Sequence, residues 1–418
     1  HFTEEDIAFL RGKGCFDEPF LDYLRSFRFT GDMWAVPEGT FVFPGEPLIT
    51  VRAPAIQAQF IETYLLMIVN HESLIATKAA RITRAAKGRA VSEFGSRRAQ
   101  GADAAILGAR AAFIGGCSST ACTLSDEVFG VPAGGTMAHS WVQMFDSELD
   151  AFRTYCEIYP HNATLLIDTY NVLDSGLPHA IAAFDEVLRP RGITSCAIRI
   201  DSGDITYLTQ KIRARLDEAG WQTCKIVVSN SMDEYIIREL IRQGACIDAF
   251  GVGERLITAK SDPVFGGVYK LCAVEAPDGT IIPKIKISEN VSKITTPHFK
   301  KVYRLRGRDT GKAEADLICL HDETVDDSQP LEIFDPQNTW KRKVLTDFTA
   351  EELLVPVFRG GELVYSLPTL PEIRAHFEAE CDGMWEEVRR FTNPHNYYVD
   401  LSQKLWDIKQ VMLNSRTH

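Results

Sequence analysis

Short apolar runs alternate with helix-like segments through the middle of the chain. Runs near residues 165–168, 196–201 and 225–229 each stop at an acid or a serine, and each is followed by a segment of helical periodicity. Apolar runs of this length are typical of strands buried in a parallel sheet. Even strand–helix alternation predicts an α/β fold, and we favour a barrel because no Gly-x-Gly-x-x-Gly fingerprint follows any strand.

The two ends of the chain have a different pattern. Residues 1–27 look helical, residues 28–53 alternate apolar side chains with glycine and proline, and a long helix is expected over 54–87. The pattern after residue 295 is basic and strand-like, with one strong helix near 370–391. Neither end has an obvious complete core of its own, so we expect them to pack together.

These patterns divide the chain into three predicted segments. Residues 1–89 form the N-terminal part of a sandwich domain, residues 90–294 form a catalytic α/β barrel, and residues 295–418 pack back on the N-terminal part. The chain opens at His1 without a methionine, so we expect the start of the full chain to be missing.

Composition narrows the class of protein. A net charge of −12 argues against a nucleic-acid partner, and no apolar stretch approaches the roughly 20 residues that cross a bilayer. The ten cysteines form no Cys-x-x-Cys pair and several lie in apolar runs. That usage favours reduced, core-filling thiols in a cytoplasmic protein over a zinc site.

Two arginines follow the first barrel strand, in Glu93-Phe94-Gly95-Ser96-Arg97-Arg98. Guanidinium groups at a strand end are suited to carboxylate or phosphate, and Phe94 could stack on a flat ring. A solvated basic loop is the equally simple alternative. No P-loop and no Gly-x-Ser-x-Gly elbow occurs in the chain, which disfavours a conventional P-loop NTPase.

A histidine beside a hydroxyl follows a glycine-rich turn, in Gly135-Thr136-Met137-Ala138-His139-Ser140. His139 could act as a general base or as a nucleophile that takes up a phosphoryl group. Asp168, at the end of a downstream apolar run, is the natural group to orient its ring. A histidine in a glycine-rich loop is otherwise a hydrogen-bonded structural residue.

Three further strand ends carry candidate binding groups. Asp201 opens Asp201-Ser202-Gly203-Asp204, where acids suit ribose hydroxyls or Mg²⁺, or else cap the next helix. Backbone amides after Ser229-Asn230 and in Gly251-Val252-Gly253 could hold a phosphate at a helix N-terminus. Glycine turns are common, so each signal alone is weak.

Together, in this order, the segments resemble those of a bacterial nicotinate phosphoribosyltransferase. The motifs that carry the resemblance are Glu93–Ala99, Gly135–Ser140, Asp168-Thr169-Tyr170, Arg199–Asp204, Val228-Ser229-Asn230, Gly251-Val252-Gly253 and the tail Asn393–Ser402. They span most of the chain. The sister family that acts on nicotinamide lacks the second arginine seen here as Arg98.

The resemblance implies an irregular α/β barrel of the type II phosphoribosyltransferases beside an α/β sandwich built from both chain ends. It implies transfer of phosphoribosyl from phosphoribosyl diphosphate to nicotinate, giving nicotinate mononucleotide and pyrophosphate in NAD biosynthesis. ATP as co-substrate, Mg²⁺ and a homodimer with a shared active site are implied as well.

The same resemblance implies residue roles. His139 would become the phosphohistidine, supported by Asp168. Substrate-binding positions would be Phe94 at the pyridine ring, Arg97 and Arg199 at carboxylate or phosphate, Asp201 at the ribose, Gly251 and Gly253 at the 5′-phosphate, with Thr120, Ser140, Ser229 and Asn230. Only Thr120 is carried over from Gly115–Thr123, because the rest of that segment departs from the family pattern. The family's opening Thr-Asp-x-Tyr motif has no match here.

Other activities remain open from the residues alone. A metal-dependent barrel lyase could use His139 as base and Asp201 as metal ligand. A nicotinamide phosphoribosyltransferase-like activity and a lapsed relative that only senses metabolites are further alternatives. The intact His139, Asp168 and Asp201 speak against the lapsed relative.

Overall fold

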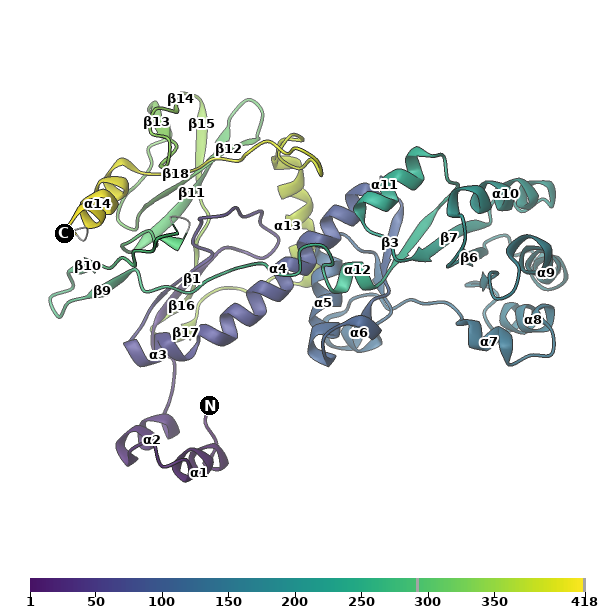
Figure 1. Ribbon diagram of the computed structural model, residues 1–418, viewed down its shortest axis with the longest axis horizontal. Helices are drawn as coiled ribbons and strands as arrows, with labels where there is room; N and C mark the ends of the chain where they lie inside the picture. Colours follow the sequence, from purple (N-terminus) through teal and green to yellow (C-terminus); the bar gives the residue numbers. More distant parts are fainter. Residues whose placement is uncertain (291–292, 416–418) are drawn as a thin grey trace. The chain divides into compact units, whose positions relative to one another are not determined.

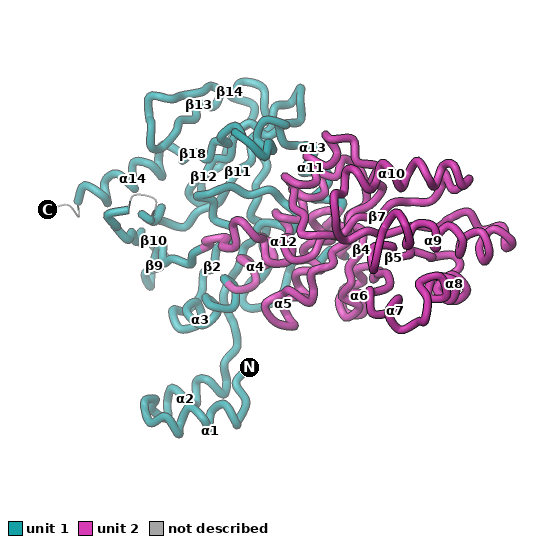
Figure 2. The backbone as a smooth tube through the Cα atoms, turned by 45° about the vertical axis from the view of Figure 1, so that its right-hand side comes forward, with its two compact units in different colours: residues 1–66, 268–369, 375–418 teal, residues 67–267, 370–374 magenta. Residues whose placement is uncertain are grey.

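The computed structural model describes residues 1–290 and 293–415, and the chain divides into two compact units (Figures 1 and 2). Unit 1 combines both ends of the chain and comprises residues 1–66, 268–369 and 375–418. Unit 2 comprises residues 67–267 and 370–374, and therefore holds all the candidate site residues.

Unit 2 is built on a six-stranded sheet in which every pair of neighbours is parallel. The strand order is β4-β3-β8-β7-β6-β5. The register pairs Ile200 with Val228 and Val228 with Phe250, so the strands end level with one another. The strands are β3 (Ala90–Glu93), β4 (Ser119–Thr120), β5 (Thr164–Leu166), β6 (Ala197–Ile200), β7 (Lys225–Asn230) and β8 (Ala249–Val252).

Helices connect these strands, as parallel pairing requires. They are α4 (Glu62–Ala85), α5 (Ala102–Ile114), α6 (Thr123–Phe129), α7 (His139–Gln143), α8 (Glu148–Ile158), α9 (Leu177–Ala183), α10 (Ile205–Glu218), α11 (Glu234–Arg242) and α12 (Glu254–Ile257). Asp204 caps α10 by accepting from the backbone N–H of Tyr207 at 3.0 Å. The capping interpretation therefore holds for Asp204, and the other acid of the segment, Asp201, is not the cap.

Unit 1 contains two four-stranded sheets with orders β17-β16-β1-β2 and β15-β11-β12-β18. Their strands are β1 (Asp32–Ala35), β2 (Ile49–Arg52), β11 (Lys300–Gly307), β12 (Ala313–Leu320), β15 (Phe348–Glu352), β16 (Val355–Arg359), β17 (Glu362–Leu363) and β18 (Val399–Leu401). Two hairpins, β9 (Ala273–Glu275) with β10 (Ile281–Pro283) and β13 (Leu331–Phe334) with β14 (Arg342–Leu345), complete the strands. The helices are α1 (Glu4–Gly12), α2 (Glu18–Arg25), α3 (Ala55–Phe60), α14 (Gln403–Asn414) and α13 (Leu370–Gly383), whose residues 370–374 belong to unit 2.

Two helices differ from the expected lengths. The helix expected over 54–87 is interrupted at Ile61, between α3 and α4. The helix expected near 370–391 ends at Gly383, where a Cβ atom would lie 2.4 Å from the guanidinium of Arg306. A larger residue there would require the Arg306 guanidinium to shift, and glycine is a poor helix former.

A fully buried arginine organises the interior of unit 1. Arg304 donates to both carboxylate oxygens of Asp316 at 3.0 and 2.7 Å and to Glu380 at 2.6 Å. Tyr397, from the tail motif, donates its hydroxyl to Asp316 at 2.8 Å and stacks on Phe43 with ring centroids 3.8 Å apart. Buried charges are tolerated only when paired and hydrogen-bonded in this way. The motif's tyrosine therefore has a structural role.

Glu46 lies beside this network and is predicted to be protonated in the folded protein. Burial and the neighbouring Asp316 carboxylate raise the pKa of Glu46 well above its usual 4.5. The folded chain then holds a proton that the unfolded chain releases, so Glu46 lowers the free energy of unfolding progressively as pH rises above about 4.5.

Glu46→Gln should leave stability little changed near pH 5 and raise it increasingly toward pH 8, measured by melting temperature. Glu5→Gln, at an exposed site on α1, is the matched control. A stability difference for Glu46→Gln that does not widen with pH would contradict the prediction.

Candidate active site

The level strand ends of unit 2 gather its chemistry-bearing side chains at one edge. Glu93 and Thr120 are the last residues of β3 and β4, Asp168 lies two residues beyond β5, and Asp201 directly follows β6. Asn230 is the last residue of β7. Because all six strands are parallel, these positions share the carboxyl edge of the sheet, where α/β proteins bind ligands.

His139 is the first residue of α7 and lies between two groups that follow β5. Its Nδ1 atom is 3.1 Å from the hydroxyl of Thr169, and its Nε2 atom is 3.9 Å from Oδ1 of Asp168. The His139 side chain is 41% exposed, whereas that of Asp168 is 1% exposed. The structure thus brings together the predicted pair and adds Thr169, to which sequence reasoning gave no role. The sequence did carry a signal for Thr169, because each of the candidate acids Asp168 and Asp201 is directly followed by a residue with a hydroxyl group.

The Asp168 carboxylate links two strand ends. Its Oδ2 atom accepts from the backbone N–H of Asp201 at 2.8 Å and from the Ser202 hydroxyl at 2.7 Å. Its Oδ1 atom is buried and has no hydrogen-bond partner within the described residues, and it is the atom that faces His139. A buried carboxylate oxygen without a donor is suited to accept from a nearby imidazole N–H.

Arg199 is held by hydroxyl groups from two other segments. Its Nε atom donates to Ser229 at 2.6 Å and its Nη1 atom donates to Thr136 at 2.7 Å. Ser229 in turn donates to Asp201 at 2.8 Å. The predicted residues Arg199, Asp201 and Ser229 therefore form one connected network, to which Thr136 of the glycine-rich turn is an addition.

The guanidinium of Arg199 is poorly hydrated and lies 5.6 Å from the ring centre of Phe94. Burial lowers the pKa of Arg199 below its usual range, while the Asp201 and Asp168 carboxylates act in the opposite direction. An arginine stays charged at any physiological pH. The site thus presents a fixed, partly desolvated positive charge beside an aromatic face, an arrangement suited to a flat anionic ligand.

Gly251 in β8 and Gly253 just after it make room for Phe94. A Cβ atom on Gly251 would lie 2.6 Å from the Phe94 ring, and one on Gly253 would lie 3.1 Å from the Phe94 carbonyl oxygen. These approaches give both glycines a packing reason for lacking a side chain. They also leave the backbone amides of the turn uncovered by side chains.

Thr120 lies inside the protein beside an acid that sequence reasoning gave no role. Both Thr120 and Glu93 are fully buried, and the Thr120 hydroxyl donates to Glu93 at 2.6 Å. The other Glu93 oxygen accepts from the backbone N–H of Gly95. Burial raises the pKa of Glu93. This pair fixes the turn that carries Phe94 and Arg97.

Three predicted residues, Arg97, Ser140 and Asn230, are exposed. Arg97 lies in the 3₁₀ turn Ser96–Arg98 and repels Arg199 electrostatically, which adds to the lowering of the Arg199 pKa. Ser140 follows His139 in α7.

Within residues 1–290 and 293–415, no cluster of three or more histidine, cysteine, aspartate or glutamate side chains could hold a metal ion. No helix of the described part of the chain is long and apolar enough to cross a membrane.

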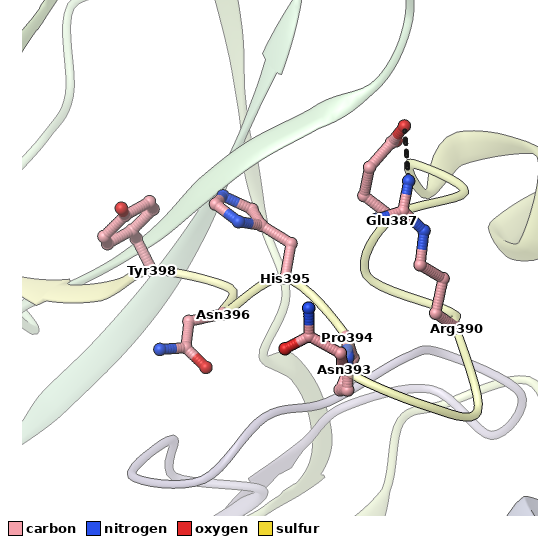
Figure 3. A pocket seen from close by; sticks show the side chains of 7 residues that line it. All are labelled: Glu387, Arg390, Asn393, Pro394, His395, Asn396 and Tyr398. Carbon is pink, nitrogen blue, oxygen red and sulfur yellow. Dashed lines mark hydrogen bonds and ion pairs between the residues drawn. The ribbon is translucent and has the colours of Figure 1, made fainter.

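A pocket of about 350 Å³ occurs in unit 1 and has no predicted site residue in its lining (Figure 3). Its walls come from the segment after α13, including part of the tail motif, and two of the lining residues, Arg390 and Glu387, pair at 3.4 Å. The lining residues are Glu387, Arg390, Asn393, Pro394, His395, Asn396 and Tyr398.

Comparison with known proteins decides the family. Residues 1–70 match the N-terminal domain of nicotinate phosphoribosyltransferase, and residues 299–409 match the C-terminal domain of the same family. Nicotinate phosphoribosyltransferase of Bacillus subtilis is 43% identical over 98% of this chain and 82% of its own length. The chain belongs to the nicotinate phosphoribosyltransferase family.

Solved structures agree with this membership. Human nicotinic acid phosphoribosyltransferase superposes with a TM-score of 0.81 at 28% identity, covering 99% of this chain and 88% of the human chain. Nicotinate-nucleotide pyrophosphorylase from Pyrococcus furiosus superposes with a TM-score of 0.66 at 26% identity, covering 85% and 81% of the two chains. The expected type II phosphoribosyltransferase fold is confirmed.

The family also confirms the expected activity. This member of the family is an enzyme of NAD biosynthesis, and the barrel lyase considered from the residues alone is thereby disfavoured.

Gly251→Ala tests whether the glycine is needed to seat Phe94. The added methyl group collides with the ring, so the variant should lose about 1–3 kcal/mol of stability and show lower kcat/KM for nicotinate. Gly134→Ala is the matched control, because its nearest neighbour would lie at an ordinary 3.5 Å. Thermal melting and initial rates are the measurements. Wild-type stability and activity in Gly251→Ala would show that Phe94 is not held as described.

Proposed function

We propose that this enzyme couples ATP hydrolysis to the transfer of phosphoribosyl to nicotinate, with His139 as the phosphate acceptor. The observation that carries the proposal is the exposed His139 ring between Thr169 and the unpartnered, buried oxygen of Asp168. Phosphoribosyl diphosphate and ATP are the co-substrates.

The transfer itself needs positioning more than acid–base chemistry. The pyridine nitrogen of nicotinate forms a bond to C1′ of the ribose as the bond from C1′ to the diphosphate oxygen breaks, and pyrophosphate leaves with the electron pair. Arg199 would pair with the nicotinate carboxylate while Phe94 lies against the ring. Asp201 would accept from the ribose hydroxyls, and the backbone at Gly251 and Gly253 would meet the 5′-phosphate. Fixed groups of opposite charge stabilise such a transition state.

The remaining predicted positions would surround the substrates. Arg97 is exposed and would meet a phosphate or the nicotinate carboxylate. Ser140 and Asn230, both exposed, would donate to phosphate oxygens. Ser229 would contribute by fixing Arg199 and Asp201. Thr120 would act through the buried bond to Glu93 and the turn beyond it.

The ATP step would use the two ring nitrogens of His139 differently. Nδ1 attacks the terminal phosphorus of ATP and ADP leaves, while the N–H on Nε2 faces Oδ1 of Asp168 at 3.9 Å and would donate to it after a small approach. Water later hydrolyses the phosphohistidine to histidine and phosphate. A carboxylate on one ring nitrogen raises the nucleophilicity of the other.

Mg²⁺ would accompany the diphosphate. This ion is usually bound by one or two carboxylates together with substrate phosphates, so a cage of protein ligands is not required. Asp201, at the strand edge and 33% exposed, is the carboxylate that fits this role. When bound, the ion would neutralise the charge of the leaving group.

We also propose a cytoplasmic homodimer. All ten cysteines are free, which suits a reducing compartment. Large apolar side chains are exposed on α1 and in the helices that follow, including Phe9 at 63% and Tyr64 at 66%. Contiguous exposed apolar patches mark protein interfaces, and these side chains would belong to one in the proposed dimer. Sedimentation of the protein at micromolar concentration should give a dimer, and a monomer alone would contradict this part of the proposal.

His139→Ala is expected to abolish stimulation by ATP while some ATP-independent transfer remains. The variant loses the phosphate acceptor but keeps the Arg199–Asp201 network that holds the substrates. His161→Ala, at an exposed histidine outside the site, is the control. Rates of mononucleotide formation with and without ATP provide the measurement. Substrate-dependent ATP hydrolysis that survives in His139→Ala would rule out His139 as the acceptor.

Arg199→Ala should raise the KM for nicotinate and narrow the preference for nicotinate over nicotinamide. A desolvated, charge-assisted pair contributes about 1.5–3 kcal/mol, or roughly ten- to a hundredfold in selectivity. Arg242→Ala, which removes an exposed arginine from α11, is the control. If the variant instead loses apparent affinity for phosphoribosyl diphosphate and keeps its acid-over-amide ratio, Arg199 serves the diphosphate.

A further inference from the structure

We propose that Glu148 is a positioning residue that holds the segment carrying His139 against the strand end carrying Asp168. The inference rests on the proposed role of His139 as phosphate acceptor. Glu148 itself is not placed to touch a substrate, since its side chain is 2% exposed. Its effect would pass through the backbone on either side.

Glu148 joins two helical segments through a buried carboxylate. It is the first residue of α8, and its Oε2 atom accepts from the Ser175 hydroxyl at 2.6 Å and from Nδ1 of His179 at 3.0 Å. Its Oε1 atom is buried and makes no hydrogen bond within the described residues. A carboxylate buried with one oxygen unpaired is costly to keep, so its bonds to Ser175 and His179 call for a reason beyond packing.

Ser175 is fixed directly against the strand end that leads to Asp168. It lies in the π-helical turn Val172–Gly176, an element frequent at functional sites. A Cβ atom on Gly176 would lie 1.9 Å from the carbonyl oxygen of Ile167, the residue before Asp168. No residue with a side chain fits at position 176, so the turn packs against the backbone at Ile167, just after β5.

Glu148 is attached on its other side to the helix that begins with His139. The indole N–H of Trp141, in α7, donates to the carbonyl oxygen of Ala151, in α8, at 3.2 Å. This hydrogen bond ties the two helices to each other. His139 is thus connected through α7 to α8, and Glu148 connects α8 to the π-helical turn. That turn packs against the strand end that carries Asp168.

The distance between His139 and Asp168 shows why this connection matters. Nε2 and Oδ1 are 3.9 Å apart, beyond a hydrogen bond but within one small displacement of it. A misplacement of about 1 Å in a reacting group can cost on the order of a hundredfold in rate. A tie between the two segments therefore controls whether the imidazole N–H meets the carboxylate.

A second tie, from α8 to a later turn of the helical run 172–188, supplies the control. Arg153, on α8, donates to Glu186, in the π-helical turn Phe184–Leu188, at 2.5 Å. Both side chains are more than a third exposed, and exposed pairs contribute little. Arg153→Ala thus breaks a link between these segments at a point away from the strand end.

The test measures phosphohistidine at His139 by mass spectrometry after incubation with ATP, together with initial rates of mononucleotide formation with and without ATP. Glu148→Ala is expected to slow phosphorylation by about a hundredfold, and Ser175→Ala by about tenfold. Glu148→Gln keeps an oxygen that accepts from Ser175, so it should restore much of the rate. Arg153→Ala should match the wild type. The ATP-independent rate and the KM for nicotinate should stay within about twofold in all four variants, because the Arg199 network is untouched.

The outcomes separate this inference from the function on which it rests. Absence of phosphohistidine in the wild type would refute the role of His139 itself. If the wild type is phosphorylated, and both Ser175→Ala and Glu148→Ala are phosphorylated at the wild-type rate, the positioning role is wrong. Equal losses of the ATP-dependent and ATP-independent rates would mean that Glu148 supports only the fold. Should Glu148→Ala not fold, Ser175→Ala and Glu148→Gln decide the question.

Discussion

The buried carboxylate of Asp168 is the interaction on which the site depends. It accepts from the backbone and hydroxyl that follow β6 while its other oxygen faces His139, which begins α7. Two neighbouring strand ends are thereby joined by one side chain, and the helix that begins with His139 lies beside it. Hydrogen bonds to a charged group contribute about 1.5–3 kcal/mol each, and removing either donor would leave the carboxylate uncompensated. A neutral side chain at position 168 would accept these hydrogen bonds more weakly than the carboxylate does.

The parallel sheet makes this interaction possible. Level strand ends bring Arg199, Asp201 and Ser229 into one hydrogen-bonded network beside the Asp168 carboxylate. The same edge holds a flat aromatic face, a desolvated cation and an exposed imidazole within one unit. Phosphoribosyl transfer needs groups of this kind held rigidly rather than a strong acid or base. The acidic character of the whole chain is therefore no obstacle, since the positive charge that matters is local.

Much of the fold follows from sequence because the strands of unit 2 are buried on both faces and read as continuous apolar runs. The ends of β6, β7 and β8 were predictable for this reason, as was the pairing of His139 with Asp168. Thr169, Thr136 and Glu93 were not assigned roles, because their contacts join segments far apart in the chain. The helix α13 ends early at Gly383, beside the guanidinium of Arg306, and no local pattern reveals that contact. The roles given to individual site residues remain predictions.

The most direct test of the account is the rate of mononucleotide formation by the unaltered enzyme from nicotinate and from nicotinamide, each with and without ATP. The arrangement of Arg199 beside Phe94, with His139 facing Asp168, predicts product from nicotinate, a faster rate with ATP, and ADP release that accompanies that product. Equal use of nicotinamide, or a nicotinate reaction that ATP does not change, would contradict it.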